Sequence, residues 1–114
     1  GQIEGGFIQG LGWLTCEELC FSKEGKLLTT GPSTYKLPGS RDIPQIFNVK
    51  LLEKADNEEK TIFRSKAVGE PPLLLAISHF LALKEAIRAS STNSRPELLN
   101  SPATPSEILK VLKV

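Results

Sequence analysis

Two adjacent prolines, Pro71 and Pro72, constrain the fold of this chain more than any other feature. A residue that precedes a proline is disfavoured in the helical region, whereas proline is well accepted at the first position of a helix. The pair therefore predicts a helix that begins near Pro72 and continues through the apolar segment 73–89. Charged residues occur in this segment only from Lys84 onward, so we expect the helix to be buried at its start and exposed at its end.

Glu70 lies directly before the two prolines and should sit just outside the N-terminus of that helix. Two interpretations fit this position. Acidic side chains are common at helix starts because they interact favourably with the positive end of the helix dipole. A carboxylate held at a fixed place can instead serve as a general base. Position alone favours the first interpretation.

Residues 1–19 have the apolar spacing of an amphipathic helix, set by Ile3, Phe7, Leu11 and Leu14. Glycines within this segment oppose a helix, because each costs roughly 0.5–1 kcal/mol relative to Ala in a helix interior. Gly6 and Gly10 are one turn apart on one face, where absent side chains allow another backbone or a ligand to come close. Close backbone packing is the favoured interpretation, and it would compensate the cost.

The middle of the chain has the pattern of short strands. A turn at Lys-Glu-Gly within 21–31 predicts a hairpin, and the proline-bearing segment 31–45 predicts an ordered loop with at most a brief strand at 34–36. Apolar and polar residues alternate in 46–52, and 61–68 can pair with it in an antiparallel manner. We therefore expect an α+β fold, a small mixed or antiparallel sheet with flanking helices.

The last part of the chain is expected to be a polar linker, 90–103, followed by a terminal helix, 104–114. Thr104 is placed as N-cap, Pro105 as the first helical residue and Glu107 three positions after the cap, which is the pattern of a capping box. Residues 1–89 would form the main body of one partial domain.

Composition excludes several classes of partner. The net charge is +1 and the charged residues are scattered, so no basic surface predicts binding to nucleic acid or membrane. No apolar run approaches the length of a membrane span and no signal peptide is recognisable, which favours a cytoplasmic setting. Cys16, Cys20 and the lone His79 lack the spacing of a metal site, so no protein-ligated metal is expected. The chain contains no methionine, and we expect it to be a piece of a longer protein.

Four motifs, taken together, resemble a known family: GQIEGGFIQGLGWLTCEEL, GPSTYKLP, SKAVGEPPLLLA and SPATPSEIL. Their order and spacing resemble the C-terminal end of the molybdenum-binding subunit of xanthine dehydrogenases, within the molybdenum hydroxylases that include aldehyde oxidases. The resemblance covers essentially the whole chain. The sequences LTCEEL and FRSKAVGEPPL are most similar to those of the bacterial type with a separate molybdenum subunit.

The resemblance implies roles for individual residues. Glu70, in the G-E-P-P motif, corresponds to the catalytic base of an enzyme that oxidises hypoxanthine and xanthine by water-derived hydroxylation. Gln2, in the opening G-Q-x-E-G motif, corresponds to a contact of the molybdenum cofactor, molybdopterin. Ala67, Val68 and Gly69 precede the base and are expected to line the same site.

The resemblance also implies that much of the enzyme lies elsewhere. The iron–sulfur clusters, FAD and NAD would be held by sequence absent here, and the partners would be the remainder of the molybdenum subunit, the iron–sulfur/FAD subunit and a purine substrate. We expect the isolated chain to be inactive, to carry no stoichiometric molybdenum and to form homo-oligomers through uncovered apolar surface. The alternative is a non-catalytic packing or oligomerisation segment, in which Glu70 only begins a helix.

Overall fold

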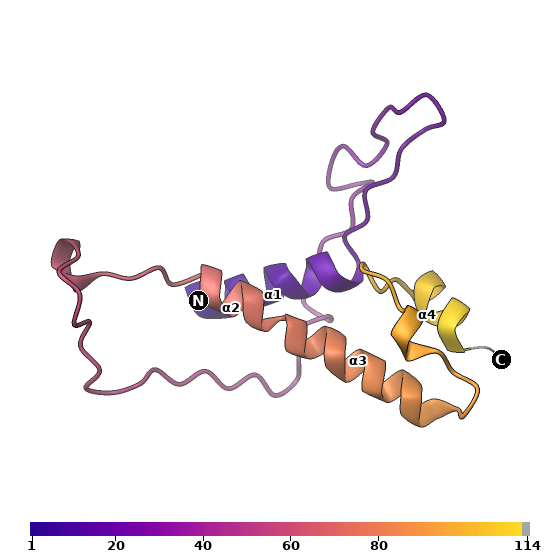
Figure 1. Ribbon diagram of the computed structural model, residues 1–114. Helices are drawn as coiled ribbons and strands as arrows, with labels where there is room; N and C mark the ends of the chain where they lie inside the picture. Colours follow the sequence, from indigo (N-terminus) through magenta and orange to yellow (C-terminus); the bar gives the residue numbers. More distant parts are fainter. Residues whose placement is uncertain (113–114) are drawn as a thin grey trace.

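A computed structural model describes residues 1–112 of the chain, and these residues are helical or irregular (Figure 1). The helices are α1 (Gln2–Thr15), α2 (Glu70–Leu75), α3 (Ile77–Ser90) and α4 (Pro105–Leu112), with single 3₁₀ turns η1 (Ile62–Arg64) and η2 (Pro96–Leu98). Within the described residues there is no β-strand, so the predicted α+β fold with a small sheet is wrong.

The predicted strands 46–52 and 61–68 lie in a long segment that leaves the helices and returns to them, with its two arms apart (Figure 1). A strand is stable only when a neighbour takes up its backbone hydrogen bonds and covers its apolar face. Here neither condition is met, since Leu52 is 84% exposed and Phe63 is 99% exposed. The alternating pattern is present in the sequence, but these residues lack a partner strand.

The predicted hairpin is present in a minimal form, without named strands, and the Leu28 amide donates to the Cys20 carbonyl at 2.8 Å across its two arms. The Ser22 amide donates a hydrogen bond of 2.8 Å to the Lys26 carbonyl, and Gly25 adopts a left-handed backbone with φ of 80°. One isolated antiparallel bridge joins Phe21 and Leu27. Residues 34–36 form no strand within the expected loop 31–45, because the Tyr35 amide closes a turn onto the Gly31 carbonyl at 2.8 Å.

Helix α1 forms as expected but ends at Thr15 instead of near Leu19. Two acidic residues, Glu17 and Glu18, follow the helix, and negative charge at a helix C-terminus is unfavourable. Glu17 accepts a hydrogen bond of 2.6 Å from the Tyr35 hydroxyl instead of continuing the helix. The end of α1 is thereby attached to the loop that follows it.

The helix after the prolines differs from the prediction in two ways. It begins at Glu70 itself, because the Leu73 amide closes the first turn onto the Gly69 carbonyl at 3.1 Å and proline needs no amide partner in that turn. It is also interrupted at Ala76, which separates α2 from α3. The expected burial of the helix start is met on one side only, since Pro72 and Ala76 are buried whereas Leu74 is 72% exposed.

Thr104 is confirmed as the N-cap of α4, but only half of the predicted capping box is present, because the Thr104 amide donates to the Pro102 carbonyl at 2.8 Å and the Glu107 carboxylate pairs with Lys110. The Glu107 amide donates to the Thr104 hydroxyl at 3.4 Å, and the Ile108 amide donates to the Thr104 carbonyl at 3.0 Å. Helix α4 starts at Pro105 and is described to Leu112. The last two residues of the predicted helix 104–114 lie outside the described range.

The apolar core lies where α3, η2 and α4 meet, and it consists of Ile87, Leu99, Ala103 and Val111. Backbone hydrogen bonds join this cluster to the rest: the Ala103 amide donates to the Leu14 carbonyl, and the Arg95 amide donates to the Val111 carbonyl, both at 2.7 Å. The segment 90–103 therefore packs on the helices, although its limits as a linker stay a prediction.

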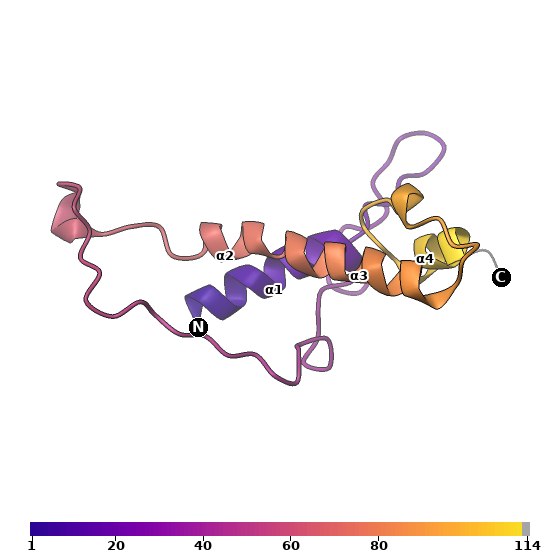
Figure 2. The same cartoon turned by 60° about the horizontal axis from the view of Figure 1, so that its bottom comes forward.

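The chain is extended for its length. Its radius of gyration is 17.8 Å, whereas a compact domain of similar size has a radius of about 13 Å. Figure 2 shows α1 lying against α2 and the first part of α3, with α4 at the other end. The structure around Glu70 is therefore formed by the packing of α1 against α2.

Candidate functional site

Glu70 is the first residue of α2 and its side chain is exposed. The two prolines that follow restrict the backbone φ angles, and the Gly69–Leu73 hydrogen bond closes the first turn. The carboxylate therefore extends from a stiff backbone into solvent. A group that must accept a proton at a fixed place benefits from such a support.

Gln2 is the first residue of α1, and the structure brings it next to the start of α2. The N-terminus lies beside α2 in both views (Figures 1 and 2). A Cβ added at Gly69 would lie 3.9 Å from the Gln2 carbonyl oxygen. Gln2 and Glu70 are far apart in the sequence, and the packing of α1 on α2 places them at the same end of the helix pair.

Ala67 and Val68 belong to the extended segment that leads into α2, and both are exposed. Gly69 is half-buried because α1 covers it. The site residues expected from the sequence therefore share one end of the molecule. They form an open surface in this chain, and none of them lines either of the two hollows described below.

The residues at this end fit contact with an organic cofactor better than direct coordination of a metal. Within residues 1–112, no three His, Cys, Asp or Glu side chains gather as metal ligands. The Gln2 side chain is exposed and makes no hydrogen bond to another described residue. An amide offers both donors and an acceptor, which is what the polar edge of a pterin requires.

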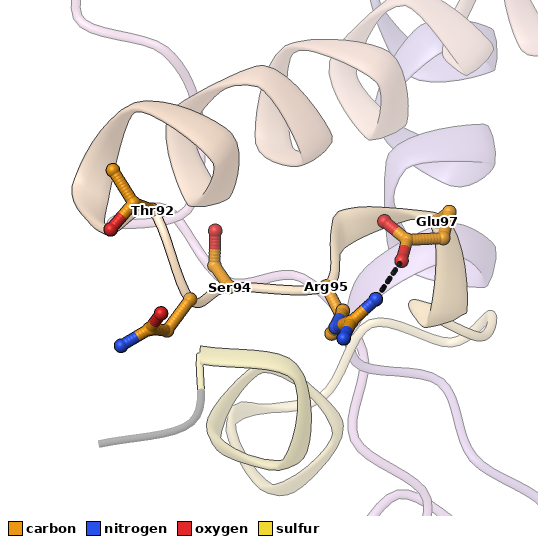
Figure 3. Close-up of a pocket in the computed structure, with 5 residues that line it drawn as sticks. Thr92, Ser94, Arg95 and Glu97 are labelled. Atoms are coloured by element: carbon orange, nitrogen blue, oxygen red, sulfur yellow. Dashed lines mark ion pairs between the residues drawn. The ribbon is translucent and has the colours of Figure 1, made fainter.

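A surface hollow lies elsewhere on the described residues. It has a volume of about 670 Å³ and is lined by Thr92, Asn93, Ser94, Arg95 and Glu97, after the end of α3. Figure 3 shows the Arg95–Glu97 ion pair at its edge, with a distance of 3.8 Å. Both charged side chains are exposed, and exposed ion pairs contribute little to the stability of the fold. The hollow is a surface depression and contains none of the predicted site residues.

Cys16 and His79 line a second hollow, of about 470 Å³, between α1, α3 and the start of α4. Most of its lining is apolar, as with Leu11 and Leu83. Both cysteines are free thiols. Cys16 and His79 are half-buried beside these apolar residues, whereas Cys20 is exposed.

The sequence indicated the close approach at Gly6 but not its partner. A Cβ at Gly6 would overlap the Gly69 carbonyl oxygen and would lie 3.1 Å from the carbonyl carbon. The spacing of Gly6 and Gly10 was the available signal. The partner of Gly6 is Gly69, the residue directly before Glu70. No local sequence pattern could identify this tertiary contact.

None of the helices within residues 1–112 is long and apolar enough to cross a bilayer. This finding concerns the described part of the chain.

Comparison with known proteins gives two kinds of match. Residues 1–44 match the family described as molybdopterin cofactor-binding domain. The chain is 54% identical to xanthine dehydrogenase/oxidase of Felis catus and 53% identical to that of Rattus norvegicus, each over 95% of this chain and 8% of the relative. It is 50% identical to xanthine dehydrogenase 2 of Arabidopsis thaliana, over 95% of this chain and 9% of that protein.

The family resemblance inferred from the motifs is thus confirmed, while the expected bacterial type with a separate molybdenum subunit stays a prediction. The chain spans less than a tenth of the length of these curated relatives. By its sequence identity over nearly its whole length, the chain is homologous to part of the xanthine dehydrogenases/oxidases, and its first 44 residues match the molybdopterin cofactor-binding domain.

Proposed function

We propose that this chain works as part of a xanthine dehydrogenase-like molybdenum hydroxylase and that it carries the catalytic base, Glu70. The observation that carries the proposal is the approach of the Gln2 backbone to Gly69, the residue directly before Glu70, at one end of the α1–α2 pair. The family match supplies independent support, because its molybdopterin cofactor-binding description covers the segment that contains Gln2.

In the proposed reaction, a purine ring carbon gains an oxygen derived from water and loses a hydrogen together with two electrons. The bound molybdenum cofactor would supply the two-electron oxidation. Glu70 would take the proton of the attacking oxygen, which requires a carboxylate within hydrogen-bond reach of that oxygen. Its position on a proline-stiffened first turn supports this role, since a base that is already oriented loses little freedom during the reaction.

Gln2 would contact the cofactor through its side-chain amide. The backbone at Ala67–Gly69 would face the same group, since it leads directly into Glu70 along the same end of the molecule. These side chains are small or apolar and leave space for a ligand to approach the backbone. Together they would hold the cofactor edge close to the base.

The remaining parts of the enzyme would come from other sequence. The proposed partners are the rest of the molybdenum subunit and the subunit that holds the iron–sulfur clusters and FAD. The exposed apolar side chains of the segment 16–69, which connects α1 to α2, support this, because such surface is normally covered. A cytoplasmic setting also stays a proposal.

The test is the Glu70→Gln change in the full-length polypeptide that carries this sequence. Glutamine keeps the shape of the side chain and cannot act as a base at neutral pH. We expect xanthine turnover to fall by several orders of magnitude while molybdenum content stays normal. Near-normal turnover would leave Glu70 as a residue that only begins α2.

A further inference from the structure

The contact between α1 and α2 is made by backbone atoms on both sides. A Cβ at Gly6 would lie 3.1 Å from the Gly69 carbonyl carbon and 3.2 Å from its Cα, and closer still to its oxygen. Only glycine fits at position 6 without a shift of one helix. The Gly69 carbonyl is the atom group that closes the first turn of α2 by accepting the Leu73 amide at 3.1 Å.

A second contact of the same kind lies one turn further along. A Cβ at Gly10 would overlap the Leu73 carbonyl and would lie 2.8 Å from the Ala76 Cβ. Gly10 is one turn after Gly6 on α1, and Leu73 is one turn after Gly69 on α2. Two contacts in the same register prevent α2 from sliding or rotating along α1.

We propose that Gly6 and Gly10 are positioning residues for Glu70, an inference that rests on the proposed function. Glu70 is joined to the first contact directly, through Gly69. Pro71 and Pro72 stiffen the turn on the other side. A displacement of Gly69 by a new side chain on α1 is therefore passed on to the Glu70 backbone.

The consequence for catalysis follows from the distance that a base requires. A misplacement of about 1 Å can reduce a rate by about 10²-fold, because the base leaves hydrogen-bond reach of its proton. General packing would predict a different result, namely loss of folded protein with unchanged properties of the molecules that remain.

The experiment compares Gly6→Ala with Gly5→Ala in the full-length polypeptide. Gly5 is the matched control, because it lies on the same helix and a Cβ there meets no atom within 4 Å. For Gly6→Ala we expect kcat per molybdenum to fall at least tenfold, with KM within about twofold. Gly5→Ala should change none of these.

A second readout does not depend on activity. Because residues 71 and 72 are prolines, the first amide after Glu70 belongs to Leu73, and it reports on the Gly69 carbonyl. Hydrogen exchange at Leu73 should be at least tenfold faster in Gly6→Ala and unchanged in Gly5→Ala. If Gly6→Ala cannot be recovered folded, Gly10→Ala is measured in the same way, with a smaller loss of kcat expected.

Three outcomes would overturn the inference: unchanged kcat in Gly6→Ala and Gly10→Ala, an equal loss in Gly5→Ala, or a loss that follows molybdenum content alone. Failure of the proposed function is recognised separately, since Glu70→Gln would then retain turnover.

Discussion

Gly10 of α1 lies so close to Ala76, at the junction of α2 and α3, that a Cβ on Gly10 would be 2.8 Å from the Ala76 Cβ. Ala76 is fully buried by this contact. The glycines that weaken α1 as an isolated helix are therefore what allows it to pack against the segment that carries Glu70.

This contact predicts opposite effects for two Gly→Ala changes in α1. Gly10→Ala should destabilise the chain by about 1 to 3 kcal/mol, because the added methyl group overpacks the helix contact. Gly5→Ala should stabilise it by roughly 0.5–1 kcal/mol, because alanine favours the helix and the site is open. Urea unfolding followed by circular dichroism measures both. Equal effects of the two changes would contradict the packing described here.

The hydrogen bond from the Tyr35 hydroxyl to Glu17 predicts a dependence of stability on alkaline pH. This bond raises the pKa of Tyr35 above its ordinary value of 10.0. A raised pKa in the folded chain means that the contribution is fully present below pH 10 and is lost as pH rises through the folded-state pKa. Tyr35→Phe should therefore unfold more easily than the parent chain at pH 7 to 9.

The difference between Tyr35→Phe and the parent chain should close above pH 10. Thermal unfolding of both chains across this pH range is the measurement, and Glu17→Gln is the matched change at the other partner. A difference that is independent of pH would show that the hydroxyl acts in another way.

The exposed apolar segment between α1 and α2 predicts self-association of the isolated chain. Phe63 is 99% exposed and has a left-handed backbone with φ of 50°. Phe63→Asn removes the apolar surface, and asparagine adopts this backbone readily. Burial of such a side chain contributes about 1.5 to 3 kcal/mol, so the dissociation constant should rise by about tenfold or more.

Sedimentation velocity over a range of concentrations measures this effect. Lys60→Asn, in the same loop, is the control and should not change the association. A parent chain that sediments as a monomer at every concentration would contradict the prediction.

The elements that could be predicted from the sequence are those determined by local residues. The predicted start of helix α4 is correct, because Thr104, Pro105 and Glu107 specify it within one turn. The apolar spacing of α1 correctly predicts a helix. Its end at Thr15 is not predictable from this spacing, because the Glu17–Tyr35 hydrogen bond joins segments that are separate in the sequence.

The predicted sheet failed for a related reason. Alternation in 46–52 specifies a strand only when another strand lies beside it, and the described residues supply none. The site was partly predictable. Glu70 and Gln2 could be named from motifs, but the approach of Gln2 to Gly69, the residue before Glu70, depends on the contact of Gly6 with Gly69, which only the three-dimensional packing reveals.

The most direct test of the account is xanthine hydroxylation by the full-length polypeptide with Glu70→Gln, with molybdenum measured on the same preparation. Glu4→Gln is the control, since Glu4 is an exposed carboxylate in the first turn of the neighbouring helix α1. The account predicts nearly abolished turnover with normal molybdenum for Glu70→Gln and normal turnover for Glu4→Gln. Normal turnover in Glu70→Gln would contradict the assignment of Glu70 as the base.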